Sequence, residues 1–383
     1  MTIDVHVLGT ASARPTATRG VSGSVIHTED GLVVVDAGEG FQTRFERHRK
    51  RLKDHDATRR LKPNRIGALL FTHGHLDHTW GTLPWLQTMS LDHREQPLLV
   101  LGPTSAEVLD AMLDGRSLPE GTPPAELALQ WKAWADVGGY AGFSYPVRWV
   151  LGDVVNDRWA EVNPAFLKAT LLDAMPQPEG WNRHRIQALP TLHSVPSCGW
   201  MVERTASLGV FDRAKAEAMG LSDEQRAQLA RGEDVNHNGT VLPGNAFRGP
   251  GAPVLRAVIS GDTAECAPGF EPHLGPDLLV HEATFLDAQG DKAVEHLHAT
   301  ATGAVRTAVQ TGAKALALTH YSSRIKSVAE PLAEAAEEAS RSAVGLPVVA
   351  LQDGDVLSLN HEGVMHRVSN DDGWTPVSMS PNR

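Results

Sequence analysis

The stretch THGHLDH, residues 72–78, decides how this chain folds and acts, because it holds three imidazoles and a carboxylate within six residues. It directly follows the apolar run Ile66–Phe71, which predicts a buried strand. His73 and His75 lie two residues apart and point to the same side of an extended segment. Asp77 and His78 fall where a helix should begin. Since Zn²⁺ accepts neutral imidazole and carboxylate ligands, the stretch predicts a metal site at the end of a strand.

Apolar runs elsewhere in the chain also end abruptly in ionisable residues. These runs and the residues that follow them are Ala257–Ser260 before Asp262, Leu278–Val280 before His281 and Glu282, and Ala315–Leu318 before His320. Sites on layered α/β proteins gather where strands end and loops begin. A histidine that only filled a core would have no reason to recur at strand ends. We therefore expect these residues to share one site.

The coarse pattern of the chain alternates β-branched apolar runs with helical stretches, which indicates an α/β protein with an αββα layered arrangement. The expected strands are Ile3–Val7, Leu32–Val35, Ile66–Phe71, Pro97–Leu101, Leu255–Ile259, Asp277–Val280, Ala315–Leu318 and Pro347–Ala350. The expected helices are Phe41–Lys53, Ser105–Leu113, Arg213–Met219, Thr302–Gln310 and Val328–Ser342. We expect one domain over residues 1–360, with an insertion at about 115–182, a substrate arm at about 205–250 and a C-terminal tail at 361–383.

Composition narrows the class of protein further. The 383 residues carry 35 Lys and Arg against 46 Asp and Glu, a formal charge of -11, which argues mildly against coating nucleic acid through bulk charge. Cys198 and Cys266 are the two cysteines, so we expect buried packing residues in a reducing compartment rather than a disulfide scaffold. With no signal peptide or membrane-spanning run in the sequence, we expect a cytoplasmic protein without a membrane partner.

One segment departs from the acidic balance. Residues 44–65 contain ten Lys or Arg and three acidic residues, a charge of +7, which leaves -18 for the rest of the chain. This segment is either a solvated helix face or a patch that meets phosphates. On the second interpretation, Arg49, Lys50 and Arg51 are the first candidates for contact with RNA.

Seven motifs in order along the chain carry a resemblance to a known family. They are LGTASARPT at 8–16, VDAGEG at 35–40, HSVPSCGW at 193–200, GDT at 261–263, HEAT at 281–284, HAT at 298–300 and THYSSR at 319–324. With the HxHxDH signature at 73–78, they resemble the metallo-β-lactamase superfamily, and within it ribonuclease Z, the zinc endonucleases that trim tRNA 3′ ends.

The resemblance implies a site with two zinc ions, or other divalent metals, in each chain. His73, His75 and His193 would hold one ion, Asp77, His78 and His320 would hold the other, and Asp262 would bridge them. A water between two such ions is acidified and becomes a hydroxide nucleophile near neutral pH. Asp77 would also orient that water or act as its base.

The same resemblance implies a proton donor for the leaving 3′ oxygen. His298 is the candidate donor, with Glu282 orienting its ring. Glu282 could instead cap a strand end, and the donor could be His296, two residues earlier. Thr300 fits a helix N-cap as readily as a phosphate contact. Further expected substrate contacts are Ser322 and Arg324.

Several positions depart from the family pattern. Leu76 stands where the family usually has Gly, and the resulting HLDH is similar to class II cyclic-nucleotide phosphodiesterases of the same superfamily. Trp200 replaces a usual Tyr, and the stretch Ala216–Val235 of the arm lacks the Gly-Pro pair that the family usually has there. Tryptophans of the 115–182 insertion either stack on bases or, more commonly, serve in packing; they are Trp131, Trp134, Trp149 and Trp159.

The sequence is therefore interpreted as a ribonuclease Z-like phosphodiesterase that acts on precursor tRNA, and the resemblance implies a homodimer. The main alternative is a superfamily hydrolase that acts on a small molecule such as a cyclic nucleotide. In a third interpretation, a non-catalytic binding module, the complete ligand set would be idle.

Overall fold

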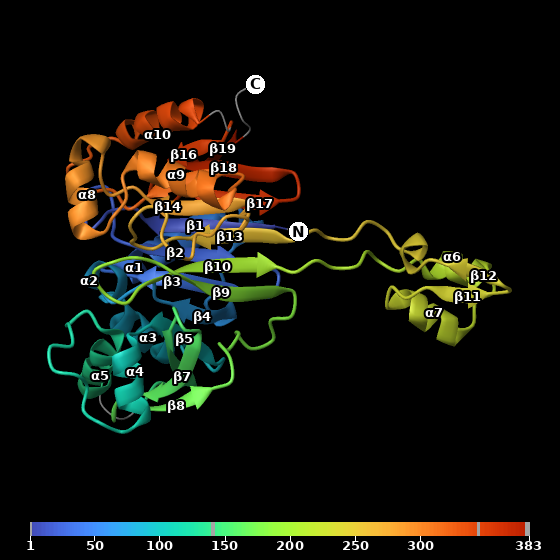
Figure 1. The fold of residues 1–383 in the computed structure, drawn as a ribbon, viewed down its shortest axis with the longest axis horizontal. Helices are drawn as coiled ribbons and strands as arrows, with labels where there is room; N and C mark the ends of the chain where they lie inside the picture. The colour runs from blue at the N-terminus through green and yellow to red at the C-terminus, as the bar shows by residue number, and fades with distance from the viewer. Residues whose placement is uncertain (1, 139–141, 343–344, 380–383) are drawn as a thin grey trace. The chain divides into compact units, whose positions relative to one another are not determined.

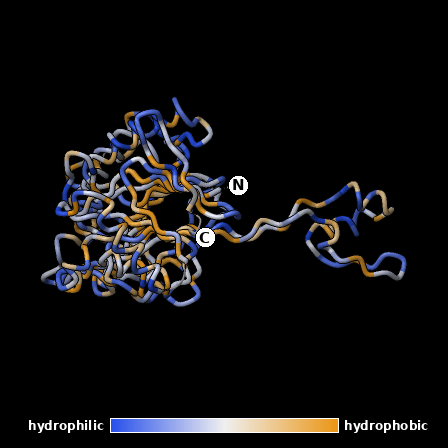
Figure 2. The backbone as a smooth tube through the Cα atoms, turned by 90° about the horizontal axis from the view of Figure 1, so that it is seen from above, coloured by the Kyte–Doolittle hydropathy of each residue, from blue (hydrophilic) through white to orange (hydrophobic). Residues whose placement is uncertain are grey.

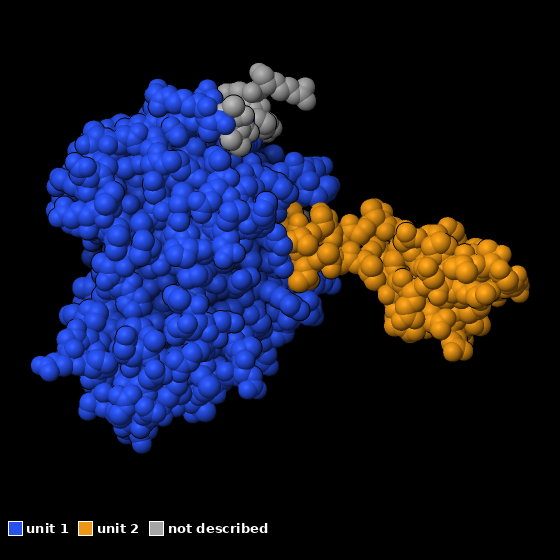
Figure 3. Space-filling view, in the orientation of Figure 1, with its two compact units in different colours: residues 1–203, 256–383 blue, residues 204–255 orange. Residues whose placement is uncertain are grey.

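The computed structural model describes residues 2–138, 142–342 and 345–379, and the chain divides into two compact units (Figure 1). Unit 1 consists of residues 1–203 with 256–383, and unit 2 of residues 204–255 (Figure 3). Residues 139–141 of the expected insertion and 380–383 of the expected tail lie outside the described residues.

Unit 1 contains two β-sheets. Over the described residues, the larger sheet has 11 strands in the order β19-β18-β17-β1-β2-β3-β4-β5-β6-β7-β8, and the smaller has 6 in the order β16-β15-β14-β13-β10-β9. The larger sheet comprises β1 (Ile3–Gly9), β2 (Gly23–His27), β3 (Leu32–Ala37), β4 (Ile66–Leu70), β5 (Leu98–Pro103), β6 (Val147–Asp153), β7 (Arg158–Asn163), β8 (Lys168–Leu172), β17 (Val356–Asn360), β18 (Gly363–Asn370) and β19 (Gly373–Ser378). The smaller comprises β9 (His184–Pro190), β10 (Cys198–Arg204), β13 (Leu255–Ile259), β14 (Leu278–Glu282), β15 (Leu316–Thr319) and β16 (Val348–Ala350).

Helices cover the outer faces of the two sheets of unit 1 (Figure 1). On the larger sheet these are α1 (Phe41–His55), α2 (Leu76–Thr79), α3 (Thr82–Leu91), α4 (Ala106–Leu113) and α5 (Leu127–Gly138), and on the smaller sheet α8 (Gly290–His296), α9 (Ala301–Thr311) and α10 (Ala329–Arg341). Short 3-10 turns lie at Ala57–Arg59, Pro63–Arg65 and Asp287–Gln289. The expected αββα arrangement is confirmed.

The pattern of buried residues explains why these elements form layers. Helices α1, α3, α4 and α5 pack an apolar cluster against the larger sheet, which includes Phe41, Phe71 and Trp131. Helices α9 and α10 pack a second cluster against the smaller sheet. Figure 2 shows hydrophobic segments concentrated toward the inside of unit 1. Burial of apolar surface on both faces of each sheet therefore holds the layers together.

Two expected boundaries differ from the structure. Residues 361–383 were expected as a tail, but Gly363–Asn370 and Gly373–Ser378 pair as an antiparallel hairpin at the edge of the larger sheet. A turn signal, Asp372 before Gly373, lies between the two strands. The insertion at 115–182 extends the same sheet, because β6 pairs with β5 in parallel and β7 and β8 continue from it.

Unit 2 has a small core of its own. Its elements are α6 (Arg213–Ala218), α7 (Asp223–Ala230), β11 (Val235–His237), β12 (Thr240–Leu242) and a 3-10 turn at Gly244–Phe247. Leu221, Leu229 and Phe247 are buried together. A capping box begins α7, in which the Ser222 hydroxyl accepts from the Gln225 N–H and the Gln225 side chain accepts from the Ser222 N–H.

Among the helices in the described part of the chain, none is both long enough and apolar enough to span a bilayer.

Candidate metal centre

The ionisable residues predicted to share a site are brought together at the carboxyl ends of strands from both sheets. The 73–78 segment follows β4 of the larger sheet, while His193, Asp262 and His320 follow β9, β13 and β15 of the smaller one. Strands β13, β14 and β15 run parallel, so the loops at their carboxyl ends meet at one edge. The local sequence pattern of strand followed by polar residue thus builds a common site.

The first cluster of side chains contains three histidines. His73 Nε2 lies 3.0 Å from His75 Nδ1, and His193 Nε2 lies 3.2 Å from the same His75 atom. With Asp262, these residues offer ligand atoms that all lie within 4.8 Å of one another. Burial lowers the pKa of His73 well below its usual range, which keeps its imidazole neutral.

The second cluster lies beside the first. His78 Nε2 and His320 Nε2 are 3.3 Å apart, and Asp77 Oδ2 lies 3.6 Å from the former and 3.5 Å from the latter. The ligand atoms of these three residues also lie within 4.8 Å of one another. The Ala13 N–H donates to Asp77 Oδ2 at 2.7 Å and holds that carboxylate in place.

Asp262 faces both clusters. Its Oδ2 lies 3.8 Å from His73 Nε2, whereas its Oδ1 lies 3.4 Å from His78 Nε2 and 3.2 Å from His320 Nε2. Burial alone would raise the pKa of Asp262, but the charges of His320 and His78 hold it well below its usual range. The carboxylate is therefore ionised, with one oxygen for each cluster.

The donor set fits divalent cations. His75 Nδ1 lies at hydrogen-bond distance from the ring nitrogens of both His73 and His193. A ring nitrogen carries at most one proton, so it cannot donate to both neighbours. Asp262 Oδ1 is buried and, among the described residues, accepts no hydrogen bond. Converging lone pairs and an unpaired buried carboxylate oxygen are what a bound cation would satisfy.

In His78, His320 and His193, the ring nitrogen that faces away from the centre also has a partner. His78 Nδ1 lies 2.7 Å from Asp36 Oδ2, and His320 Nδ1 lies 2.9 Å from the Thr284 hydroxyl. His193 Nδ1 lies 3.1 Å from the Leu297 carbonyl. Such outer partners set the tautomer and the ring orientation of metal-binding histidines.

Asp36 is a functional residue that the sequence analysis left without a role. Its backbone is left-handed, with φ 59°, and its carboxylate accepts from the Thr72 N–H and hydroxyl at 2.8 Å each. The signal was present, because Asp36 stands in the VDAGEG motif at the end of a strand. No spacing rule, however, connects position 36 to His78.

His298 and Glu282 form the predicted pair beside the clusters. His298 Nδ1 lies 2.7 Å from Glu282 Oε1 and 3.9 Å from Asp262 Oδ2. Burial lowers the pKa of His298, but the charge of Glu282 outweighs it and the net effect raises the pKa to about 9. Glu282 also accepts from the Thr263 N–H at 2.9 Å, so its carboxylate lies inside the site in contact with His298.

A cleft of about 480 Å³ opens beside the centre. His75, His193 and His298 line it together with Ser322 and Arg324. The cleft therefore contains both predicted substrate contacts of the THYSSR motif. His296 lines the cleft as well, but its ring stacks against Phe285 with 6.4 Å between centroids.

Thr300 is the N-cap residue of α9. Its side chain accepts from the Gly303 N–H at 3.1 Å and caps α9. The residue is 6% exposed and is not among the residues that line the described cleft. Its hydroxyl is thus engaged in beginning a helix, and the phosphate contact has no support.

Some basic residues of the 44–65 segment make contacts within the fold. Arg51 donates to the Gly373 carbonyl at 2.7 Å and lies over the Trp374 ring at 4.8 Å, so it fastens the C-terminal hairpin. Arg49 pairs with Glu46 on the exposed face of α1. Lys50 is exposed. Of the three candidates for RNA contact, Arg51 is therefore the least suited.

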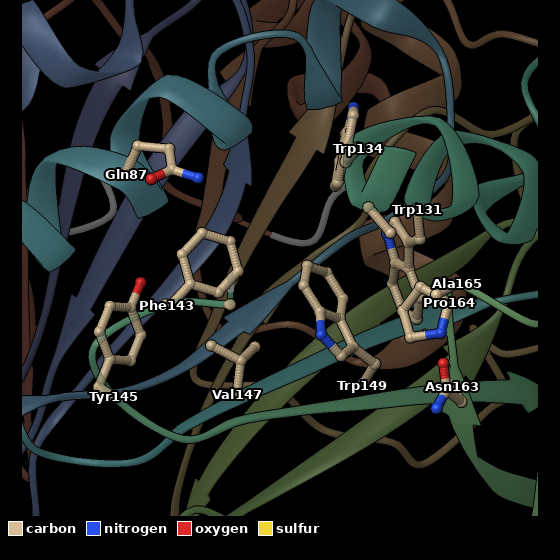
Figure 4. A pocket seen from close by; sticks show the side chains of 12 residues that line it. Gln87, Trp131, Trp134, Phe143, Tyr145, Val147, Trp149, Asn163, Pro164 and Ala165 are labelled. Carbon is tan, nitrogen blue, oxygen red and sulfur yellow. The ribbon is translucent and has the colours of Figure 1, made fainter. Parts of the chain in front are cut away.

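The tryptophans of the insertion pack against one another. Trp131 and Trp159 are buried, and the rings of Trp131 and Trp149 lie 5.0 Å apart. Trp131, Trp134 and Trp149 line a cavity of about 360 Å³ (Figure 4). Cys198 is buried and its thiol lies 3.7 Å from the Phe71 carbonyl, as expected for a packing residue.

Helix α5 of the insertion contacts the metal-binding loop directly, which the sequence analysis missed. The Gln130 side-chain amide donates to the Gly74 carbonyl, between His73 and His75. A Cβ at Gly74 would lie 1.8 Å from the Ala125 carbonyl oxygen, so only glycine fits there. No local pattern relates Gln130 to a loop 56 residues earlier.

Replacing Gln130 with leucine is expected to weaken metal binding about 10- to 100-fold, the range typical for loss of an outer contact to a metal ligand. The loop between His73 and His75 would lose the hydrogen bond that holds its backbone. Competition with a chromogenic chelator measures the affinity. Lys132→Gln, an exposed change on the same helix, is the control. Equal affinities for wild type and Gln130→Leu would contradict the positioning role.

Comparison with known proteins assigns the class first. Residues 17–127 match the family described as the metallo-beta-lactamase superfamily. A crystal structure of human tRNase Z, short form, superposes with a TM-score of 0.51 at 23% identity, covering 92% of this chain and 98% of that chain. The fold is thus that of a metallo-β-lactamase protein.

Curated relatives narrow the class to one family. Ribonuclease Z of Haloarcula marismortui is 30% identical over 359 residues, covering 92% of this chain and 96% of the relative. Ribonuclease Z of Ignicoccus hospitalis is 31% identical over 336 residues, covering 88% and 93% respectively. This chain belongs to the ribonuclease Z family, and the predicted resemblance is confirmed.

Proposed function

We propose that this chain is a metal-dependent endoribonuclease that removes the 3′ trailer from precursor tRNA. One observation carries the proposal. In a member of the ribonuclease Z family, two clusters of imidazoles share the carboxylate of Asp262 beside an open cleft. A phosphodiester that enters this cleft meets His75 and His193 of the first cluster together with His298, whose ring Glu282 contacts.

Two zinc ions per chain are the proposed cofactors. His73, His75 and His193 would hold one, Asp77, His78 and His320 the other, and Asp262 would contact both. Divalent metal ions supply Lewis acidity toward phosphate oxygens and lower the pKa of water. The outer contacts from Asp36 and Thr284 keep the rings of His78 and His320 aimed at the centre.

His298 is proposed as the proton donor to the leaving 3′ oxygen. Its Nδ1 contacts Glu282, so its Nε2 is the atom left to meet a substrate from the cleft. Glu282 stabilises the charged imidazolium, which therefore carries a proton near neutral pH. Ser322 and Arg324 line the same cleft, and Arg324 supplies a positive charge suited to a phosphate.

The proposal is tested by incubating zinc-loaded protein with a precursor tRNA. Cleavage after the discriminator nucleotide, leaving a 3′ hydroxyl, is the expected result. If the same preparation leaves the RNA intact but hydrolyses cyclic AMP, the substrate is a small phosphodiester instead. Protein isolated without chelators and holding far less than two metals per chain would favour a binding module over an enzyme.

Unit 2 is proposed as the substrate arm. It connects to unit 1 at β10 and β13, which are neighbours in the smaller sheet, and Arg256 Nε lies 2.7 Å from Glu203 Oε2 at that point. The two chain ends at the base of unit 2 are therefore adjacent. A short glycine-containing turn can replace residues 205–254 without opening the sheet.

Replacing residues 205–254 with such a turn is expected to reduce cleavage of precursor tRNA about tenfold or more while hydrolysis of bis(p-nitrophenyl) phosphate stays within twofold of wild type. The RNA would lose contacts away from the reacting phosphate, and a small diester would not. Initial rates on both substrates measure the difference. A proportional loss on both would show that unit 2 supports the fold rather than the substrate.

A homodimer and residence in the cytoplasm stay predictions. Light scattering after size exclusion, with and without zinc, measures the mass of the particle in solution. A mass of 41.2 kDa, that of one chain, would contradict the dimer.

A further inference from the structure

The first two strands carry polar residues where an apolar layer is expected. In β1, Ile3, Val5 and Val7 alternate with Asp4 and His6, so the polar residues share one face of the strand. Asp4 is only 4% exposed and His6 is 0% exposed. Core-facing positions of a strand normally hold Val, Ile or Leu, so burial of these two side chains needs a reason.

Two further histidines, His27 and His48, lie beside Asp4 and His6. Asp4 of β1 pairs directly with His27 of β2, which places the two side chains next to each other. His48 of α1 packs over the strand, with its Nε2 2.9 Å from His6 Nδ1. Asp4, His6 and His27 offer one ligand atom each, and these atoms all lie within 4.8 Å of one another.

Three polar atoms of this cluster have no hydrogen-bond partner among the described residues. They are Asp4 Oδ1, His6 Nε2 and His27 Nδ1, and all three are buried. Burying a polar group without a partner costs free energy, so three such groups together destabilise a single strand pair unless something else satisfies them. The second polar atoms of His6 and Asp4 are engaged, because His6 Nδ1 contacts His48 and Asp4 Oδ2 lies 3.4 Å from Arg59 Nε.

The protonation of the cluster favours ligand behaviour. Burial, followed by the charge of His48, lowers the pKa of His6 well below its usual range. Burial likewise lowers the pKa of His48 to about 3. Both imidazoles are neutral at physiological pH. If His6 Nδ1–H donates to His48 Nε2, then His6 Nε2 carries a lone pair that is free to bind a cation.

We propose that Asp4, His6 and His27 bind a divalent cation at a site separate from the catalytic centre. Two neutral imidazoles and one carboxylate are a donor set typical of Zn²⁺, with a water completing four ligands on the half-buried His27 side. His48 acts as the outer partner that fixes the tautomer of His6. Arg59 pairs with the second oxygen of Asp4 and limits that carboxylate to one metal contact.

The consequence of this site is structural. The cation fastens β1 to β2 under α1, close to the start of the chain. Strand β1 continues through Gly9 into the loop that carries Ala13, whose N–H holds the Asp77 carboxylate. A cation on β1 therefore stabilises the strand that leads into the catalytic cleft without taking part in the reaction.

Zinc alone is the probe for the test. Crystals of the full chain soaked in Zn²⁺ are measured above and below the zinc absorption edge. We expect an anomalous peak between Asp4, His6 and His27, in addition to those at the catalytic centre. A map with peaks at the catalytic centre and none between these three residues overturns the proposal.

A solution experiment uses variants that leave the catalytic residues intact. His27→Gln is expected to hold one zinc fewer per chain than wild type, by elemental analysis after gel filtration. Hydrolysis of bis(p-nitrophenyl) phosphate should stay within twofold, and the rise in thermal midpoint on zinc addition should become smaller. His361→Gln, at an exposed turn, is the matched control and should keep the wild-type zinc content. Unchanged zinc content in folded His27→Gln, with folding checked by circular dichroism, contradicts the proposal.

Discussion

Replacing Asp262 with alanine is expected to lower turnover of both RNA and small phosphodiesters about 10³-fold or more. Its two oxygens face the two histidine clusters separately, so the substitution removes a proposed ligand from both metals at once. A metal ion contributes several kcal/mol of charge stabilisation in the transition state, and about 1.4 kcal/mol corresponds to a tenfold change in rate. Steady-state kinetics and elemental analysis on the same preparation measure activity and metal content.

A matched control for Asp262→Ala lies in the same loop. Glu265 is three residues further along, and its exposed side chain pairs with Arg306. An exposed ion pair contributes at most about 1 kcal/mol, so Glu265→Gln should leave turnover and metal content near wild type. Substantial activity in Asp262→Ala with full metal content would remove the bridging role.

His298→Ala is expected to lower kcat on precursor tRNA about 10²- to 10⁴-fold with little change in KM, as is typical for loss of a general acid. The acid protonates a leaving oxygen only in the transition state, so ground-state binding should persist. His296→Ala is the matched control, because His296 lines the same cleft two residues away. Loss of turnover in His296→Ala rather than in His298→Ala would assign the proton to the other histidine.

The pH dependence separates an acid from a merely structural histidine. A general acid must be protonated, so the wild-type rate should fall as pH rises through the His298 pKa of about 9. Glu282→Gln removes the charge that raises this pKa, and the alkaline fall should then begin at lower pH. A substrate with a p-nitrophenol leaving group needs little protonation, so His298→Ala should affect it much less. An equal loss on both substrates would contradict the acid role.

Most of the candidate ligands could be predicted from sequence because they follow apolar runs, as the 73–78 segment, Asp262 and His320 do, whereas His193 was assigned through the family resemblance. The sequence favoured His298 as the proton donor but left His296 open, since both fall in the same short segment. The structure favours His298, because Glu282 contacts His298, which lies 16 residues away in the chain. Asp36 and Gln130 were missed for the same reason, because their partners lie 42 and 56 residues away.

The fold class was predictable because strands such as β1 and β4 are buried along most of their length. The strands of the insertion and of the C-terminal hairpin were not predicted. Strand β8 alternates irregularly between exposed and half-buried residues at a sheet edge, so its hydrophobic period is weak. An edge strand forms because it pairs with a neighbouring strand, and the local sequence pattern does not reveal that pairing.

The proposed ligands come from both sheets, and this has a consequence for how unit 1 unfolds. Cations held by the loop after β4 and by the loops after β9, β13 and β15 join the two layers as a reversible cross-link between positions 73 and 320 of the chain. An unfolded chain cannot offer these residues together, so bound metal stabilises only the fully assembled layers. Chelation should therefore lower the melting temperature of unit 1 as one cooperative transition instead of loosening a single loop.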